Sequence, residues 1–231
     1  MAPSTTAAEV LLFVPNLIGY ARVACTLAFL YLARDRASWH VALSSYIVSF
    51  ALDLFDGMAA RRFHQTSRFG AVLDMVTDRC STAVMLAVLA HLYAGAHPRA
   101  FDAFIALMVL DVASHWVQMK AAGDMHHKSS SRNFIVRFYY EKYWFFGYCC
   151  VGAEFFYIFM YGYFFVDQGS VLNDYTGGMH VHGPDGLVYK IAVYGMLPGC
   201  LIKQFVNVCQ LSAASASIAA ADAAEYNAKS Q

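Results

Sequence analysis

Long apolar runs alternate with short polar stretches along the whole chain. Each run holds about 20 residues, enough for a helix to cross a hydrocarbon core about 30 Å thick. The expected helices cover residues 11–32, 39–60, 70–93, 101–119, 143–166 and 188–211. Neither an internal repeat nor a soluble domain interrupts this pattern. It predicts an all-α integral membrane protein with six transmembrane helices, organised as a single membrane domain over residues 1–231.

Composition supports the membrane class. Hydrophobic residues make up 59% of the 231 residues and charged residues only 14%, whereas soluble domains are about 45–50% apolar and about 25% charged. The formal net charge is zero, which argues against a nucleic-acid partner. The six cysteines lie in apolar runs without a metal-binding spacing, so we interpret them as small core residues.

The positions of lysine and arginine predict an orientation. Basic residues gather in the loops at 61–68 and 120–142, while the opposite loops hold few. Because cytosolic loops are enriched in Lys and Arg, these two loops are expected in the cytosol, together with both termini. The Ala/Ser-rich tail at 212–231 is expected to be either an interfacial helix or disordered, and we assign it no function.

Four acids stand out where the second run ends and the third begins: Asp53, Asp56, Asp74 and Asp78. Their i, i+3 and i, i+4 spacings place each pair on one helix face. An unpaired acid in a transmembrane helix costs about 2.5–3.5 kcal/mol, so a compensating positive charge is expected there. Two facing pairs would form an oxygen-rich cup suited to hard divalent cations. A buried polar network or an ion pathway would use the same positions.

The acids belong to a longer motif, DxxDGxxAR, eight further residues, then GxxxDxxxD, between Asp53 and Asp78. This motif resembles that of the CDP-alcohol phosphatidyltransferase family, six-helix membrane enzymes that move a phosphatidyl group from a CDP-linked lipid to an alcohol. Four further segments are similar to the eukaryotic phosphatidylinositol synthase branch of the family. They are residues 15–22, 69–82, 111–116 and 152–157.

The resemblance implies roles for the motif residues. Asp53, Asp56 and Asp74 would be ligands of a two-metal site that holds Mg²⁺ or Mn²⁺. Asp78 would be the general base and a further contact to the metal. The residues expected to bind the CDP-lipid are Gly57, Ala60, Arg61, Gly70 and Arg68. For Arg68 a role in setting topology is an equal alternative, and for Arg62 that role is favoured.

The resemblance also implies substrates: CDP-diacylglycerol as donor and myo-inositol as acceptor. A neutral polyol needs several hydrogen-bonding side chains, and Glu154, Arg137 and His115 are the candidates. An interhelical hydrogen bond is the alternative for Glu154. For Asp111 and His115, which are four residues apart, we favour a structural pair.

Two further functions stay open. A sibling enzyme would use serine or glycerol phosphate, although a phosphorylated acceptor would need a denser basic cluster than this chain offers. A divalent-cation conduit would need acids spread across the bilayer, whereas these lie at one end of their helices. The resemblance further implies a homodimer among membrane lipids. The eukaryotic-type branch, with no signal for another organelle, predicts the endoplasmic reticulum membrane, and the distribution of Lys and Arg predicts an active site facing the cytosol.

Overall fold

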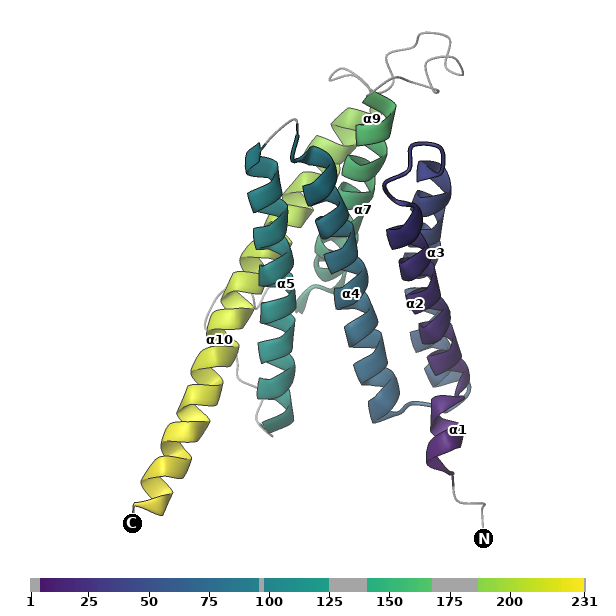
Figure 1. Ribbon diagram of the computed structural model, residues 1–231. Helices are drawn as coiled ribbons and strands as arrows, with labels where there is room; N and C mark the ends of the chain where they lie inside the picture. Colours follow the sequence, from purple (N-terminus) through teal and green to yellow (C-terminus); the bar gives the residue numbers. More distant parts are fainter. Residues whose placement is uncertain (1–4, 96–97, 125–140, 168–186, 231) are drawn as a thin grey trace. The chain divides into compact units, whose positions relative to one another are not determined.

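The computed structural model describes residues 5–95, 98–124, 141–167 and 187–230, and every regular element within these ranges is a helix (Figure 1). In chain order the elements are α1 (Ala7–Leu11), α2 (Val14–Leu32), α3 (Trp39–Arg62), α4 (Arg68–Tyr93), α5 (Pro98–Asp124), α7 (Tyr143–Asp167), α9 (Leu187–Lys190), the π-helix η1 (Ile191–Met196) and α10 (Leu197–Lys229). The predicted all-α class is confirmed.

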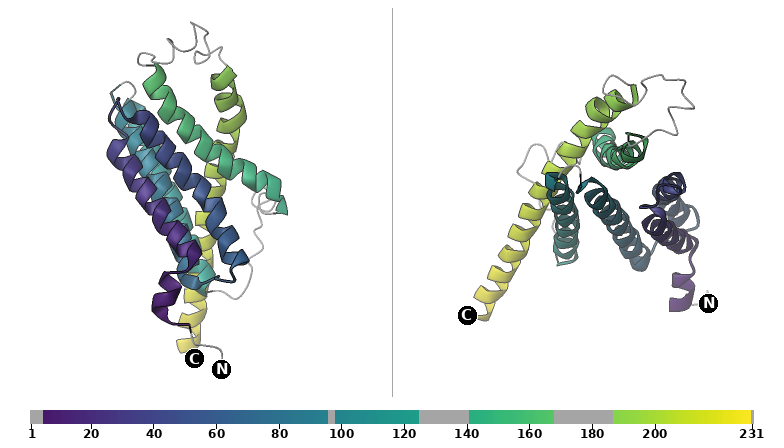
Figure 2. Two further views of the ribbon diagram at one scale, coloured as in Figure 1. Left: turned by 90° about the vertical axis from the view of Figure 1, so that its right-hand side faces the viewer. Right: turned by 45° about the horizontal axis from the view of Figure 1, so that its top comes forward.

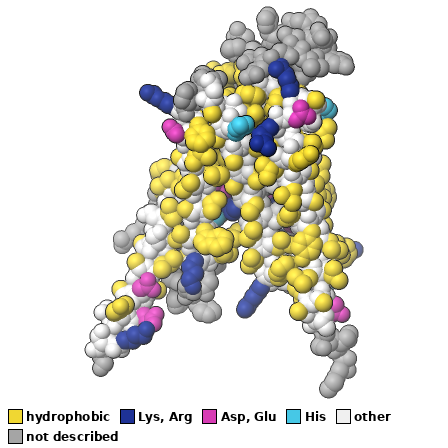
Figure 3. Space-filling model, in the orientation of Figure 1, with side chains coloured by type: hydrophobic (Ala, Val, Ile, Leu, Met, Phe, Trp, Pro, Cys, Tyr) yellow, Lys and Arg dark blue, Asp and Glu magenta, His cyan; other side chains and the backbone are white. Residues whose placement is uncertain are grey.

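Within the described residues, five segments are long and apolar enough to cross a membrane. They are α2, α3, most of α5, most of α7 and the continuous stretch of η1 and α10. The helix α4 has 26 residues, but its first half carries Arg68, Asp74, Asp78 and Arg79. The chain is therefore an integral membrane protein, and its sixth span stays a prediction. The face drawn in Figure 3 is mostly covered by hydrophobic side chains, as lipid contact requires.

The chain divides into two compact units, residues 1–98 and 99–231. In the first unit, α2 packs against both α3 and α4. Two glycines allow the contact with α4. A Cβ at Gly19 would lie 2.9 Å from Leu73 Cδ2, and one at Gly70 would lie 2.9 Å from Asn16 Oδ1. Small residues at such positions let membrane helices approach closely.

The turn between α3 and α4 is built from local hydrogen bonds. His64 has a φ of 55°, the left-handed conformation that commonly ends a helix. The Gln65 N–H then donates to the Ala60 carbonyl at 2.9 Å. Ser67 caps α4, because its hydroxyl accepts from the Gly70 N–H at 3.0 Å. These bonds fix the chain next to the motif residues.

The turn between α2 and α3 is held by Asp35. Its carboxylate accepts hydrogen bonds from the Ser38 hydroxyl and from the Ala37 N–H. These bonds, the Ser38 hydroxyl first, hold the pKa of the Asp35 carboxyl below its usual value.

In the second unit, α7 packs against η1 and α10 (Figure 2). A Cβ at Gly152 would lie 3.4 Å from the Met196 carbonyl oxygen, and one at Gly199 would lie 3.1 Å from that of Tyr148. The π-helix precedes Pro198, whose ring would clash with the Tyr194 carbonyl in a regular α-helix. From Leu197 the helix continues without a break to Lys229, so the described part of the tail is helical.

Candidate active site

Four carboxylates from two helices converge in the first unit. Asp53 and Asp56 lie in the second half of α3, and Asp74 and Asp78 lie in the first half of α4. Ligand oxygens of Asp53, Asp56 and Asp74 all lie within 4.8 Å of one another. Asp78 joins them through an arginine that all four acids share. We call these four acids the acid cluster.

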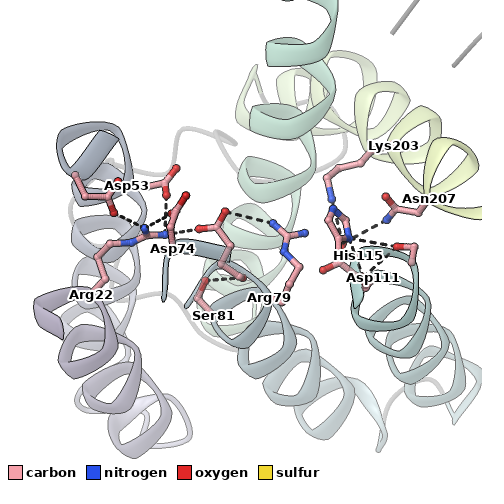
Figure 4. Close-up of polar contacts among 12 residues, drawn as sticks. Arg22, Asp53, Asp74, Arg79, Ser81, Asp111, His115, Lys203 and Asn207 are labelled. Carbon is pink, nitrogen blue, oxygen red and sulfur yellow. Dashed lines mark hydrogen bonds and ion pairs between the residues drawn. The ribbon is translucent and has the colours of Figure 1, made fainter. Parts of the chain in front are cut away.

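That arginine is Arg22 of α2, which projects into the middle of the acid cluster (Figure 4). Its Nη1 lies 2.6 Å from Asp56 Oδ2 and 2.9 Å from Asp74 Oδ1. Its Nη2 lies 2.7 Å from Asp53 Oδ1 and also pairs with Asp78. Arg22 is only 2% exposed. A positive charge beside these acids is expected from the sequence, but nothing in it assigns that charge to Arg22 except the presence of an arginine inside an apolar run.

Asp78 has a second basic neighbour. Its Oδ2 lies 3.6 Å from Nη2 of Arg79, and its carbonyl accepts from the Ser81 hydroxyl at 2.9 Å (Figure 4). Four carboxylates thus contact two guanidinium groups. When all are ionised, the acids exceed the bases by two charges, so the site has room for further positive charge.

The donor set fits a hard divalent cation. Mg²⁺ and Mn²⁺ prefer carboxylate oxygens, and here three carboxylates from two helices already lie within reach of one ion. The excess of negative charge points the same way, because an uncompensated charge in a membrane helix is costly. Asp53, Asp56 and Asp74 are the residues that would hold such an ion.

A cavity of about 300 Å³ opens next to the acid cluster. Six motif residues line it, namely Asp56, Gly57, Ala60, Arg61, Gly70 and Asp74, whereas Arg68 does not. A Cβ at Gly57 would meet only the Arg61 guanidinium, at 3.5 Å. Gly57 thus widens the cavity without being required by helix packing.

The cavity wall also holds polar residues that the sequence analysis did not assign to the site. Asn16 is 1% exposed and donates from Nδ2 to the Val10 carbonyl at 2.6 Å. Gln65 accepts from the Val14 N–H through Oε1 at 2.9 Å. Thr66 and Ser67 complete this wall. Gln65, Thr66 and Ser67 follow the end of α3, where no apolar pattern indicates a site.

The proposed acceptor residues lie elsewhere in the chain. Arg137 is outside the described residues. Glu154 is half-buried in α7, and His115 lies in α5 of the same unit. His115 Nδ1 is 2.8 Å from the Asp111 carbonyl oxygen and 3.7 Å from Asp111 Oδ1. These contacts agree with the structural pair favoured for Asp111 and His115.

Asp111 belongs to a second buried polar cluster. Its Oδ1 accepts from Lys203 Nζ at 3.1 Å and from Asn207 Nδ2 at 3.3 Å (Figure 4). Asp111 is 2% exposed and Lys203 5%. The cluster continues through Gln204, whose Nε2 donates to the Tyr157 hydroxyl at 3.0 Å. Lys203 could not be identified from the sequence, because its partner Asp111 is 92 positions away.

Comparison with known proteins identifies relatives. A family model described as CDP-alcohol phosphatidyltransferase matches residues 12–132. A rat protein named CDP-diacylglycerol–inositol 3-phosphatidyltransferase is 38% identical, over 94% of this chain and 96% of its own. An Arabidopsis thaliana protein named probable CDP-diacylglycerol–inositol 3-phosphatidyltransferase 2 is 36% identical, over 90% of this chain and 89% of its own. The Schizosaccharomyces pombe protein with the same name as the rat protein is 36% identical, over 88% of this chain and 87% of its own. No solved structure is significantly similar.

Proposed function

This chain belongs to the CDP-alcohol phosphatidyltransferase family, and we propose that it transfers the phosphatidyl group of CDP-diacylglycerol to myo-inositol, forming phosphatidylinositol and CMP. The observation that carries the proposal is that Asp56 and Asp74 belong to the acid cluster and also line the cavity. A pyrophosphate in this cavity would therefore lie beside a cation held by the acids. The printed names of the relatives supply the acceptor.

The mechanism assigns work to both motif helices. Asp53 and Asp56 of α3 and Asp74 of α4 would hold one or two Mg²⁺ or Mn²⁺ ions. When bound, such ions neutralise charge on the phosphoryl oxygens and on the leaving nucleotide. Asp78 takes the proton from the inositol hydroxyl while the inositol oxygen attacks the β-phosphorus of the CDP-lipid and CMP departs. Asp78 suits this role because it lies outside the group of three metal-binding carboxylates but shares Arg22 with them.

The CDP-lipid would bind in the cavity. Gly57, Ala60 and Gly70 leave room for the nucleotide, since each lines the cavity with little or no side chain. Arg61 lines it too, and its planar guanidinium is suited to a bidentate contact with phosphate. Arg68 is exposed and outside the lining, so we assign it the topology role that the sequence left open.

Several finer features remain proposals. Glu154 and Arg137 are proposed to bind the acceptor. His115 is the weaker candidate because its Nδ1 already contacts Asp111 and Ser114. We also propose that α4 crosses the membrane in addition to the five segments above, which gives six spans with cytosolic termini. The chain would form one membrane domain and a homodimer. It would lie in the endoplasmic reticulum membrane with the active site facing the cytosol.

A transfer assay on the purified full chain tests the proposal. CDP-diacylglycerol, Mn²⁺ and a panel of alcohols are supplied, and CMP release is measured. We expect release with myo-inositol only, and its loss when a chelator is added. Release with serine or glycerol phosphate instead would keep the family mechanism and overturn the acceptor. If no alcohol gives CMP although Mn²⁺ binds, the cation conduit becomes the better account.

A further inference from the structure

We propose that Arg22 is the internal counter-ion of the acid cluster: it pairs with the carboxylates and competes with a divalent cation for them. The inference rests on the proposed metal site and concerns what this chain's own arginine does there. It makes Arg22 a positioning residue that sets how tightly the metal is bound.

The first argument is the geometry of the guanidinium. Each terminal nitrogen of Arg22 pairs with one acid from α3 and one from α4. Nη1 contacts Asp56 and Asp74, and Nη2 contacts Asp53 and Asp78. A planar group with a fixed fork is needed to satisfy four acceptors in this way, and a lysine ammonium would not reproduce it. Arg22 thus connects three helices at one point.

The second argument is that arginine and cation need the same ligands. The carboxylates of Asp53, Asp56 and Asp74, which are close enough together to hold an ion, are the ones that Arg22 contacts within 2.9 Å. A carboxylate oxygen that donates its lone pairs to a metal makes a weaker partner for an N–H group. Two cations that share these acids also repel each other. Binding of one therefore weakens binding of the other.

The backbone of Arg22 is held by hydrogen bonds, but its guanidinium group is not fully hydrogen-bonded. Its carbonyl accepts from the Thr26 hydroxyl of the same helix at 3.0 Å and from the Ser49 hydroxyl at 3.1 Å, and the Ser49 bond ties the main chain to α3. Its Nε is buried without a hydrogen-bond partner. An unsatisfied buried donor is costly, so the side chain has something to gain from another position while its backbone stays in place.

The test measures Mn²⁺ binding to the full chain in detergent by electron paramagnetic resonance. Thermal unfolding is measured in parallel. In Arg22→Gln we expect Mn²⁺ to bind about tenfold more tightly, since a competing charge is removed. Without metal this variant should unfold at a lower temperature than the wild type. Saturating Mn²⁺ should restore most of that loss, because a ligand that binds only the folded state stabilises it.

The matched control is Arg34→Gln, which removes the same charge from an exposed position just after α2. It should change neither the Mn²⁺ dissociation constant nor the metal-dependent stabilisation. Arg22→Lys keeps the charge but loses the fork, so its affinity for Mn²⁺ should lie between those of wild type and Arg22→Gln. This variant also keeps the test decisive if Arg22→Gln does not fold.

Several results would overturn the inference. If Arg22→Gln and Arg22→Lys bind Mn²⁺ no more tightly than the wild type, Arg22 is only a structural tie or supports the metal ligands. Weaker binding in both variants would mean that Arg22 and the ion occupy the site together. Failure of the wild type itself to bind Mn²⁺ would instead reject the metal site of the proposed function.

Discussion

Each of the two units contains a cluster of polar side chains, and the two clusters differ in burial and in charge balance. Asp111 and Lys203 are buried, whereas the side chains of Asp53, Asp74 and Asp78 are 31%, 49% and 32% exposed. In the second unit, Asp111 contacts the Lys203 ammonium, the Asn207 amide and the His115 ring, so one negative charge meets one positive charge when His115 is neutral. In the first unit, four carboxylates meet the guanidinium groups of Arg22 and Arg79. The charges around Asp111 in the second unit therefore balance, whereas the acid cluster in the first unit has an excess of negative charge.

This difference separates a structural cluster from a candidate catalytic one. A balanced buried pair has no need of a ligand, and its value is to fix the helices that carry it. A cluster with excess acid in an apolar setting gains from any added cation, which is what a metal-assisted phosphoryl transfer requires. The cavity supports the distinction, because it adjoins the acid cluster and is lined by two of its members.

The largest expected effect is on chemistry in the first unit. Replacing Asp78 with asparagine removes the proposed general base but keeps the size of the side chain. We expect turnover to fall by about 10²–10⁴-fold, measured as CMP release with myo-inositol. Mn²⁺ binding should persist through Asp53, Asp56 and Asp74. The control is Asp102→Asn, an exposed carboxylate in α5, and near-normal turnover in Asp78→Asn would remove Asp78 from the mechanism.

The next effect concerns stability in the second unit. Lys203→Met leaves Asp111 buried without its cation, and breaking a buried pair in this way costs about 3–5 kcal/mol of unfolding free energy. The double variant Lys203→Met with Asp111→Asn should recover most of the loss, since no unpaired charge remains. Unfolding in mixed detergent micelles measures both. The control is Lys190→Met, at an exposed position of α9. A double variant as unstable as the single one would contradict a balanced pair.

Two glycines in different helices should respond differently to an added methyl group. Gly70→Ala places a Cβ 2.9 Å from Asn16 Oδ1 and should lower the free energy of unfolding by about 1–3 kcal/mol. Gly147→Ala in α7 meets nothing within 4 Å, and we expect a gain of up to about 1 kcal/mol from higher helix propensity. Equal responses of the two variants would show that α2 and α4 do not approach closely at Gly70.

Much of this picture could be predicted from the sequence. The length of the apolar runs located the long helices, and the spacing of the four acids indicated that they would share a site, because helical geometry is local. The sequence did not reveal which base would meet those acids. Arg22 is 31 positions before Asp53, and nothing in periodicity states which helix packs beside which. The same reason explains Lys203, whose pairing depends on the packing of α5 with α10.

The walls of the cavity were also beyond prediction. Asn16 reaches the cavity from the start of α2, and its side chain donates to the Val10 carbonyl. Gln65 reaches it from the turn after α3, and its side chain accepts from the Val14 N–H. Turn geometry of this kind depends on single residues such as His64, whose left-handed φ no apolar pattern indicates.

We propose that the acid cluster binds divalent cations and that the cluster around Asp111 does not. The most direct measurement is the amount of Mn²⁺ bound by the wild type, by Asp53→Asn/Asp56→Asn/Asp74→Asn and by Asp111→Asn, read by electron paramagnetic resonance. We predict that the triple variant loses bound Mn²⁺ while Asp111→Asn retains it in full. Retention of Mn²⁺ by the triple variant would contradict the claim, because the ion would then be held elsewhere.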